Sequence, residues 1–175
     1  MVRKGLVFNV FAAAVMACAL GACEGTPPPK SATASTAASD RAEIERLVVT
    51  EMEGARDHDI DKTMSVYAPG DELVLFDAAP GVFKGYDAMK AAYLKYFAMF
   101  PGRPVTEIQD LTIGVSGDLA FAHSIQKWDF QKPDGTVLKT MHRVTNVFRR
   151  IDGKWLCVHE HASVPVNLFK EEGGQ

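Results

Sequence analysis

The sequence lacks the features that would tie it to nucleic acid or to a membrane-spanning domain. Beyond residue 20 it has no apolar run long enough to cross a bilayer. It has no cluster of lysine and arginine, and its formal net charge is −3. A mildly acidic chain without basic clusters argues against binding to nucleic acid or to anionic lipid headgroups. Gly114, Gly117 and Gly135 are typical of turns, so no phosphate-binding loop is predicted.

The N-terminus has the pattern of an exported protein. Arg3 and Lys4 precede the run GLVFNVFAAAVMACAL, which is short for a spanning helix and ends in small residues. The junction LGAC, residues 20–23, resembles a bacterial lipobox. The resemblance implies that a lipoprotein signal peptide (1–22) is removed and that Cys23 is lipidated, which anchors the protein to an envelope membrane facing the periplasm. An ordinary signal peptide and an uncleaved anchor are the alternatives.

Cysteine is scarce, and its three positions leave no internal disulfide. Cys18 would be discarded with the leader and Cys23 would carry lipid, so Cys157 would be the one remaining thiol. Because Cys157 lies in an apolar, strand-like run, it is predicted to be a buried and inert side chain. The leader contains Arg3 and Lys4 but no acidic residue, so its removal would change the net charge from −3 to −5.

The next segment, EGTPPPKSATASTAAS, has no large apolar side chain and is rich in proline, serine, threonine and alanine. Such a composition cannot bury enough apolar surface to fold, so it is predicted to be a flexible linker. The predicted organisation is therefore the lipidated cysteine and linker over 23–39, one domain over 40–170, and a tail over 171–175.

The predicted elements of the domain follow the order helix, helix, strand, helix and then four long strands. The first helix starts near Asp40, the second lies in HDIDKTMSVYAPG, ELVLFD is a short strand, AAPGVFKG is a loop, and the third helix spans about 87–100. The four strands lie in VTEIQDLTIGV, LAFAHSIQKWDF, TVLKTMHRVTNVFRR and KWLCVHEHASV, separated by turn signals. This order predicts an α+β domain, in which three N-terminal helices pack on one face of a curved, mainly antiparallel sheet.

Three segments carry a resemblance to a known family: HDIDKTMSVYAPGDELVLFD, FKGYDAMKAAY and RVTNVFRRIDGKWLCVHEHASVP. With the element order, they resemble the NTF2-like superfamily and its SnoaL-like and ketosteroid isomerase-like domains. The resemblance covers residues 41–167. It implies an NTF2-like cone with a pocket at one end, and a homodimer formed through the outer face of the sheet. It does not define an activity, because this fold carries enzymes, binding modules and assembly domains.

The last predicted strand contains the histidines that raise the question of chemistry. In a regular strand Trp155, Cys157, His159 and His161 share one side, and Glu160 lies on the other. The resemblance implies that the Trp155 side faces the helices, so both histidines are expected to face the pocket. On the preceding strand Arg143, Thr145 and Val147 share a face, as do Ser124, Gln126 and Trp128 on the strand before it.

Metal binding is a weak interpretation of the two histidines. Residues i and i+2 on a strand lie about 6.5–7 Å apart, close enough to chelate one ion. A site also needs a third ligand, for which Asp77 and His123 are the candidates, and no dense cluster of ligating residues accompanies them. Neither a metal nor a cofactor is predicted.

The ketosteroid isomerase resemblance allows the acid–base residues of that family to be compared with the residues at the same positions of this sequence. Asp77 aligns with the catalytic base of that family. The position of its oxyanion-hole tyrosine falls near Met52, and that of its second acid falls near Thr145 or Asn146, so steroid isomerisation by that route is not expected.

A different division of roles remains open for the same region. Asp77 could orient His161 as a general base, with Arg143 binding an anionic oxygen. In the structural alternative, Asp77 caps the turn after its strand, Arg143 pairs with a carboxylate, and His161 binds backbone.

Aromatic residues favour a ligand-binding interpretation. Tyr86 and Trp128 lie near the ends of predicted elements and, with Arg143 and His159, are predicted to line a pocket for a small, partly apolar molecule. Three classes of function remain: a binding module, a cofactor-free isomerase, cyclase or dehydratase using Asp77 and His161, and a structural module of an envelope complex.

Overall fold

The computed structural model describes residues 30–166. The signal peptide, Cys23 and the tail from 171 lie outside these residues, so leader cleavage and lipidation stay predictions. Within the described part of the chain, no helix is both long enough and apolar enough to cross a bilayer.

The first long helix, α1 (Lys30–Asp57), begins ten residues before the predicted start at Asp40. Residues 30–39 contain neither glycine nor proline and are rich in alanine, so they can be helical without burying apolar surface. Residues 36–39 are exposed accordingly. From Asp40 onward apolar residues recur at helical spacing on one side of the helix, and the buried ones are Ile44, Val48, Met52 and Ala55.

The predicted second helix is only one turn long. The helix α2 (Ile60–Met64) starts at the N-cap Asp59, whose Oδ1 accepts a hydrogen bond from the Lys62 backbone N–H at 2.9 Å. The helix ends at Met64 because the backbone that follows it pairs with the last strand. Ala68 N–H donates to the Cys157 carbonyl, and Cys157 N–H donates to the Val66 carbonyl, each at 2.8 Å. The domain therefore has two long helices and a short one.

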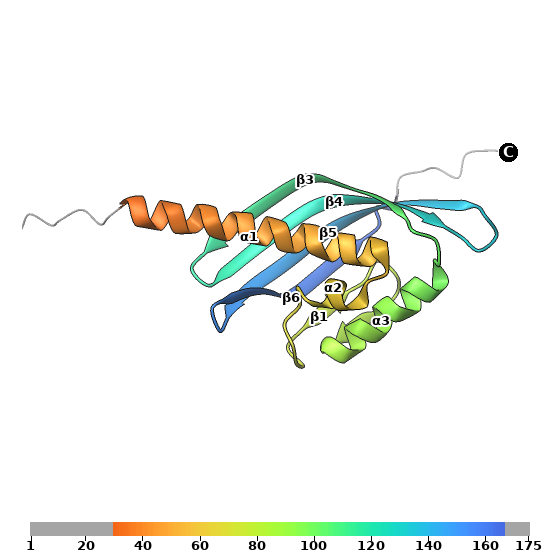
Figure 1. Cartoon of the computed structure of the whole chain (residues 1–175), viewed down its shortest axis with the longest axis horizontal. Coiled ribbons are helices and arrows are strands. Elements are labelled where there is room, and N and C mark those ends of the chain that lie inside the picture. Colours follow the sequence, from red (N-terminus) through yellow and green to blue (C-terminus); the bar gives the residue numbers. More distant parts are fainter. Residues whose placement is uncertain (1–29, 167–175) are drawn as a thin grey trace, which may run out of the picture.

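The second long helix, α3 (Tyr86–Met99), lies within one residue of its predicted bounds. It begins after Gly85, whose φ of 88° is a left-handed conformation that favours glycine. Figure 1 shows α1, α2 and α3 gathered over one side of the sheet, with the long strands running behind α1.

The sheet has six strands in the order β2-β1-β6-β5-β4-β3. The strands are β1 (Val74–Phe76), β2 (Val82–Lys84), β3 (Val105–Ser116), β4 (Leu119–Gln131), β5 (Val137–Ile151) and β6 (Lys154–Ser163). The predicted meander β3 to β6 is confirmed as antiparallel, whereas β1 pairs with β6 in parallel, which makes the sheet mixed. The strand β2 falls where the sequence predicted a loop, because it forms a three-residue hairpin partner for β1.

Two clusters of buried side chains hold the helices on the sheet. The larger one centres on Trp155, Phe148 and Ile44, and the smaller one contains Met52, Ala55, Trp128 and Phe130. Cys157, 1% exposed, belongs to the larger cluster, and burial raises the pKa of its thiol well above the usual value. The prediction of a buried thiol is thus confirmed.

A β-bulge interrupts the pairing of β5 with β6. Val147 lies opposite His159, but the next residue, Phe148, lies opposite Cys157, so Val158 is an extra residue. A bulge changes which residues share a face beyond it. Trp155 and Cys157 point to the helices as predicted, but beyond the bulge Glu160 and Ala162 are the buried residues and His161 is exposed.

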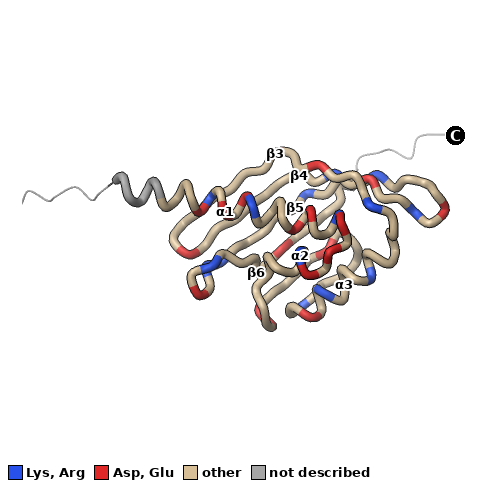
Figure 2. The backbone as a smooth tube through the Cα atoms, viewed as in Figure 1, with Lys and Arg blue, Asp and Glu red and all other residues tan. Residues whose placement is uncertain are grey.

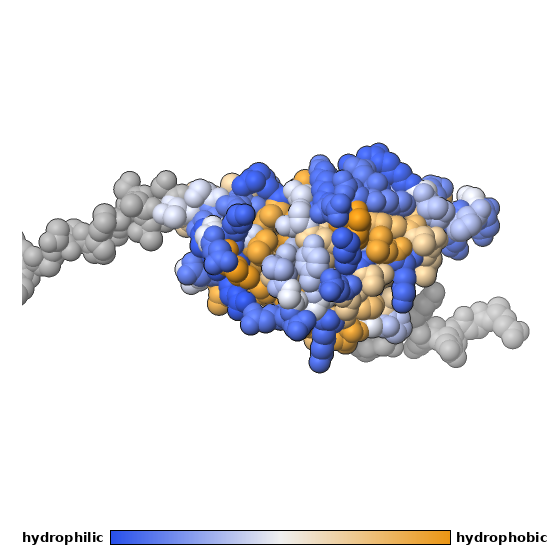
Figure 3. Space-filling model, turned by 60° about the horizontal axis from the view of Figure 1, so that its bottom comes forward, coloured by the Kyte–Doolittle hydropathy of each residue, from blue (hydrophilic) through white to orange (hydrophobic). Residues whose placement is uncertain are grey.

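The surface carries both charge signs and several apolar areas. Lys and Arg positions are spread over the domain rather than gathered on one element (Figure 2). On the face drawn in Figure 3, apolar side chains form patches that polar side chains interrupt. Leu119, Phe121 and Met141 are exposed on β4 and β5. The homodimer expected to form through the outer face of the sheet stays a prediction.

Candidate functional site

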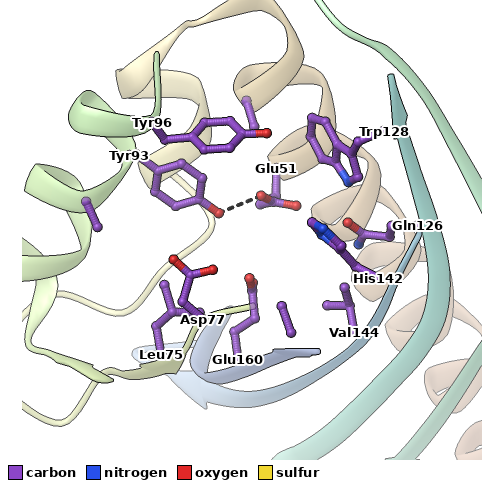
Figure 4. A pocket seen from close by; sticks show the side chains of 13 residues that line it. Glu51, Leu75, Asp77, Tyr93, Tyr96, Gln126, Trp128, His142, Val144 and Glu160 are labelled. Atoms are coloured by element: carbon purple, nitrogen blue, oxygen red, sulfur yellow. Dashed lines mark hydrogen bonds between the residues drawn. The ribbon is translucent and has the colours of Figure 1, made fainter. Parts of the chain in front are cut away.

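A cavity of about 90 Å³ opens between α1, α3 and the inner face of the sheet (Figure 4). Three carboxylates line it: Glu51 from α1, Asp77 after β1, and Glu160 from β6. The aromatic side chains that line it are Tyr93, Tyr96 and Trp128. The cavity thus combines acidic groups with apolar aromatic surface.

Glu51 and Glu160 are connected by a continuous chain of hydrogen bonds through two tyrosines. Glu51 Oε1 lies 2.7 Å from Tyr93 Oη, Tyr93 Oη lies 3.1 Å from Tyr67 Oη, and Tyr67 Oη lies 2.6 Å from Glu160 Oε2. Asn146 Nδ2 donates to the same Glu160 oxygen at 2.8 Å. The chain therefore links a carboxyl group on α1 to one on β6 across the interior of the domain.

The two carboxyl groups at the ends of this chain accept hydrogen bonds from the tyrosines. Tyr93 Oη donates to Glu51 Oε1, and Tyr67 Oη donates to Glu160 Oε2. Asn146 donates a second hydrogen bond to the same Glu160 oxygen. The ionised form is therefore stabilised more at Glu160 than at Glu51, so Glu51 is the acid that keeps a proton more readily.

The pKa values of the two acids agree with this assignment. Burial, and then the charge of Glu160, raise the pKa of Glu51 to about 8 against the opposing hydrogen bond of Tyr93. Burial raises the pKa of Glu160 to about 7, although its hydrogen bonds from Tyr67 and Asn146 lower it. Between these values the pair holds one proton, as coupled acids do.

The wall opposite Glu51 and Asp77 is built by neighbouring residues of β4 and β5. Gln126 lies opposite His142 in the strand register, and both line the cavity. The side chain of Gln126 is 4% exposed, and its amide faces the open cavity without a hydrogen-bond partner among residues 30–166. Burial lowers the pKa of His142, so its imidazole is neutral at pH 7.

The structure places two of the predicted site residues in the cavity. Asp77 lines it, and its Oδ1 also accepts a hydrogen bond from the Ala79 backbone N–H at 3.3 Å, so it caps the turn as well. Trp128 lines it from β4, where Ser124, Gln126 and Trp128 share the inner face as predicted.

The predicted histidines do not line the cavity. His161 is exposed, and its ring makes an edge contact with Phe76. His159 is half-buried, and its Nδ1 lies 3.0 Å from the Val74 carbonyl oxygen. The predictions failed because the bulge at Val158 reverses the alternation of faces, and a catalytic His161 facing the cavity is excluded.

Arg143 and Tyr86 also lie elsewhere. Arg143 is exposed on the outer face of β5, because His142 and Val144 are the residues of that strand that line the cavity. Tyr86, the first residue of α3, packs against the larger core cluster and does not line the cavity.

Sequence reasoning missed both acids of the proton-sharing pair. The sequence did contain a signal for Glu51, because it follows Ile44 and Val48 at helical spacing and so falls on the buried face, where a charged residue is unexpected. Glu160 had none, because strict alternation from Trp155 assigns it to the outer face. The contact of Tyr93 with Glu51 joins residues 42 positions apart, which no local pattern indicates.

Metal ligands do not gather in the described part of the chain. Within residues 30–166 no group of three or more histidine, cysteine, aspartate or glutamate side chains is arranged to hold an ion. His159 and His161 lie on the same outer face of β6 beyond the bulge, where both rings contact Phe76, but within residues 30–166 no third ligand is arranged with them.

Comparison with known proteins gives consistent results. The SnoaL-like domain profile matches residues 44–167. An NTF2-like protein of unknown function from Pseudomonas putida is 33% identical, with a TM-score of 0.67 over 75% of this chain and 91% of that chain. No curated protein sequence matches the chain.

Two more distant structures are similar in fold. An NTF2-like superfamily protein from Salmonella enterica serovar Typhimurium is 18% identical, with a TM-score of 0.70 over 78% of this chain and 99% of that one. A ketosteroid isomerase-like protein from Erwinia carotovora atroseptica is 21% identical, with a TM-score of 0.63 over 73% and 98%. At these identities the likeness concerns the fold alone.

Proposed function

Because the chain belongs to the SnoaL-like domain family, we propose that its domain binds a small, partly apolar molecule in the cavity between α1, α3 and the sheet. The observation that supports this most directly is the Gln126 side chain, which is 4% exposed and presents its amide to the cavity without a partner in the described residues. This amide is free to bond to solvent or to a polar group of a ligand that enters the cavity. Trp128 and Tyr96 would contact the apolar part of the ligand.

Filling the cavity tests this proposal. Ala92 of α3 lines the cavity, whereas Ala98 of the same helix is exposed, so Ala92→Phe and Ala98→Phe form a matched pair. Mass spectrometry of small molecules released by denaturing the purified full-length protein is expected to detect a ligand with the wild type and with Ala98→Phe. Ala92→Phe should retain at least about tenfold less, because its ring occupies the ligand volume. Equal retention by both variants would contradict the proposal.

Proton transfer by a cofactor-free enzyme of isomerase, cyclase or dehydratase type is the second candidate. One observation favours it: Glu160 has a pKa of about 7 and borders the same cavity as the protonated Glu51. A general base is most effective when its pKa is close to the working pH. With His161 outside the cavity, Glu160 would be the base and Glu51 the acid, while Asp77 would border the substrate.

Deuterium exchange tests this candidate without knowledge of the natural substrate. The α-hydrogens of cyclopentanone in D2O, followed by proton NMR, are expected to exchange faster with protein than with buffer. Glu160→Gln should reduce the protein-dependent rate by about 10²–10⁴, the usual contribution of a general base. Glu107→Gln, an exposed carboxylate on β3, is the control and should keep the rate. An unchanged rate in Glu160→Gln would exclude Glu160 as the base.

The proposal also includes the lipid anchor at Cys23. The lipobox-like LGAC junction supports it, and it lies outside the described residues. Labelling of producing cells with radioactive palmitate is expected to mark the wild-type protein and not Cys23→Ala, because the acceptor thiol is then missing. Palmitate label on Cys23→Ala would contradict this proposal, because it would show that a residue other than Cys23 is acylated.

A further inference from the structure

The lining of the cavity has an unbalanced charge. It contains the carboxyl groups of Glu51, Asp77 and Glu160, and no lysine or arginine is among the lining residues that the structure describes. The basic residue of the lining is His142, whose pKa is lowered by burial, so it adds no positive charge at pH 7.5. An anionic ligand would be repelled, and a neutral one would leave the carboxylates without a counter-charge.

Glu160 is the acid most in need of a positive partner. It is 7% exposed, and its hydrogen bonds within the described residues, from Tyr67 and Asn146, both use Oε2. A carboxylate has about four acceptor positions, so Oε1 is available to a donor from the cavity. A buried carboxylate without a cation is unfavourable, and a ligand cation would remove this penalty.

The proton count limits the charge that a ligand must supply. Because burial, and then the charge of Glu160, raise the pKa of Glu51 to about 8, the pair of Glu51 and Glu160 holds one proton at pH 7.5 and carries a single negative charge, and Asp77 adds a second carboxylate beside it. A monovalent cation therefore matches the Glu160 end of the cavity. The absence of a metal-binding group within residues 30–166 favours an organic cation over a metal ion.

The remaining walls are suited to an ammonium group. Trp128 and Tyr96 present aromatic rings to the cavity, and rings of this kind attract cations through their π faces (Figure 4). The unpartnered Gln126 amide, 4% exposed and on the same wall as Trp128, offers a carbonyl oxygen that accepts from N–H. This side chain is an observation independent of the acidic groups.

We propose that the cavity selects a small organic cation, namely an alkylammonium head group that pairs with Glu160 and contacts Trp128 and Gln126. The inference rests on the proposed ligand-binding function and narrows its ligand class. The cavity volume of about 90 Å³ is below the roughly 150 Å³ of an engineered cavity that binds benzene, so a head group with a short chain fits.

Three probes of similar shape distinguish selection of a cation from binding of any small molecule. They are butylammonium, 1-butanol and butyrate, at pH 7.5 and equal ionic strength. An alkylammonium is protonated at this pH, as a lysine side chain is. Binding is followed by NMR of the full-length ¹⁵N-labelled protein through its two tryptophan indole N–H signals. Trp128 lines the cavity and reports the ligand, while Trp155, buried in the larger core cluster, is an internal control.

Butylammonium is expected to shift the Trp128 signal and to bind at least about tenfold more tightly than 1-butanol, with no detectable binding of butyrate. Glu160→Gln should reduce this preference to less than about threefold, and Asp77→Asn, which serves if Glu160→Gln does not fold, should also reduce it. Glu107→Gln, outside the cavity, should keep it.

Two results would overturn the inference in different ways. If 1-butanol or butyrate shifts Trp128 and binds as tightly as butylammonium, the cavity binds small molecules but does not select cations. If none of the three shifts Trp128 up to about 50 mM, where even millimolar affinities are detected, both the cation inference and the proposed binding function fail.

Discussion

Replacing Trp155 with alanine is expected to lower the free energy of unfolding by about 4 kcal/mol. The side chain is 1% exposed and lies in the larger core cluster. Its indole N–H donates to Asp40 Oδ1 at 3.2 Å, and the Arg150 guanidinium lies 4.4 Å from its ring centroid. The substitution would therefore leave a cavity, remove a cation–π contact and separate β6 from the start of the buried part of α1.

Urea unfolding followed by far-UV circular dichroism measures this loss. Because small domains are stable by about 5–15 kcal/mol, a loss of this size is a large part of the total. Trp155→Phe is the matched control, because it keeps most of the apolar volume and removes only the hydrogen bond, so it should lose about 1–2 kcal/mol. A loss below about 1 kcal/mol for Trp155→Ala would mean that the ring does not hold α1 on the sheet.

Replacing Glu51 with glutamine is expected to stabilise the protein at alkaline pH by about 2–4 kcal/mol. The folded protein keeps the Glu51 proton up to a pKa of about 8, whereas the unfolded chain releases it near the ordinary value of 4.5. Stability is therefore complete below pH 4.5 and falls as the pH rises through 8. Glutamine cannot ionise, and its side-chain oxygen can accept the hydrogen bond from Tyr93 as Glu51 does, so the variant avoids this loss.

Stability measured by urea unfolding between pH 4.5 and 9 tests this expectation. Wild type and Glu51→Gln should be similar at pH 4.5, should diverge progressively as the pH rises from 4.5 to 8, and should keep a constant difference above that. Glu53→Gln, on the same helix, is the matched control of opposite sign, because the Lys62 hydrogen bond lowers the pKa of Glu53 and its loss brings no gain. Parallel curves for wild type and Glu51→Gln would show that Glu51 is ionised in the folded protein.

The behaviour of Glu51 also shows how far sequence patterns reach into the site. The apolar stripe of α1 was predictable, since Ile44, Val48, Met52 and Ala55 recur at helical spacing and are buried. Glu51 falls on the same face, so its burial followed from the helical period. What it touches did not follow, because Tyr93 comes from another helix and Glu160 from the last strand.

The final strand shows the limit of counting alternate residues. Alternation assigned Trp155 and Cys157 correctly, because they precede the bulge. The extra residue Val158 then reverses the faces, so Glu160 lines the cavity in place of His161. Arg143 failed for a related reason: the side of β5 that faces the helices is decided by its pairing with β4, which aligns Gln126 with His142.

The α+β class, the two long helices and the antiparallel meander of four strands were determined by the sequence alone, because these follow from local periodicity and turn residues, whereas Asp77 was identified through the family resemblance. The acidic character of the cavity, the hydrogen-bonded connection of Glu51 to Glu160 through two tyrosines and the exclusion of both histidines were decided only by the tertiary structure. They depend on the register of β5 and β6 and on contacts between residues up to 93 positions apart, such as Tyr67 with Glu160.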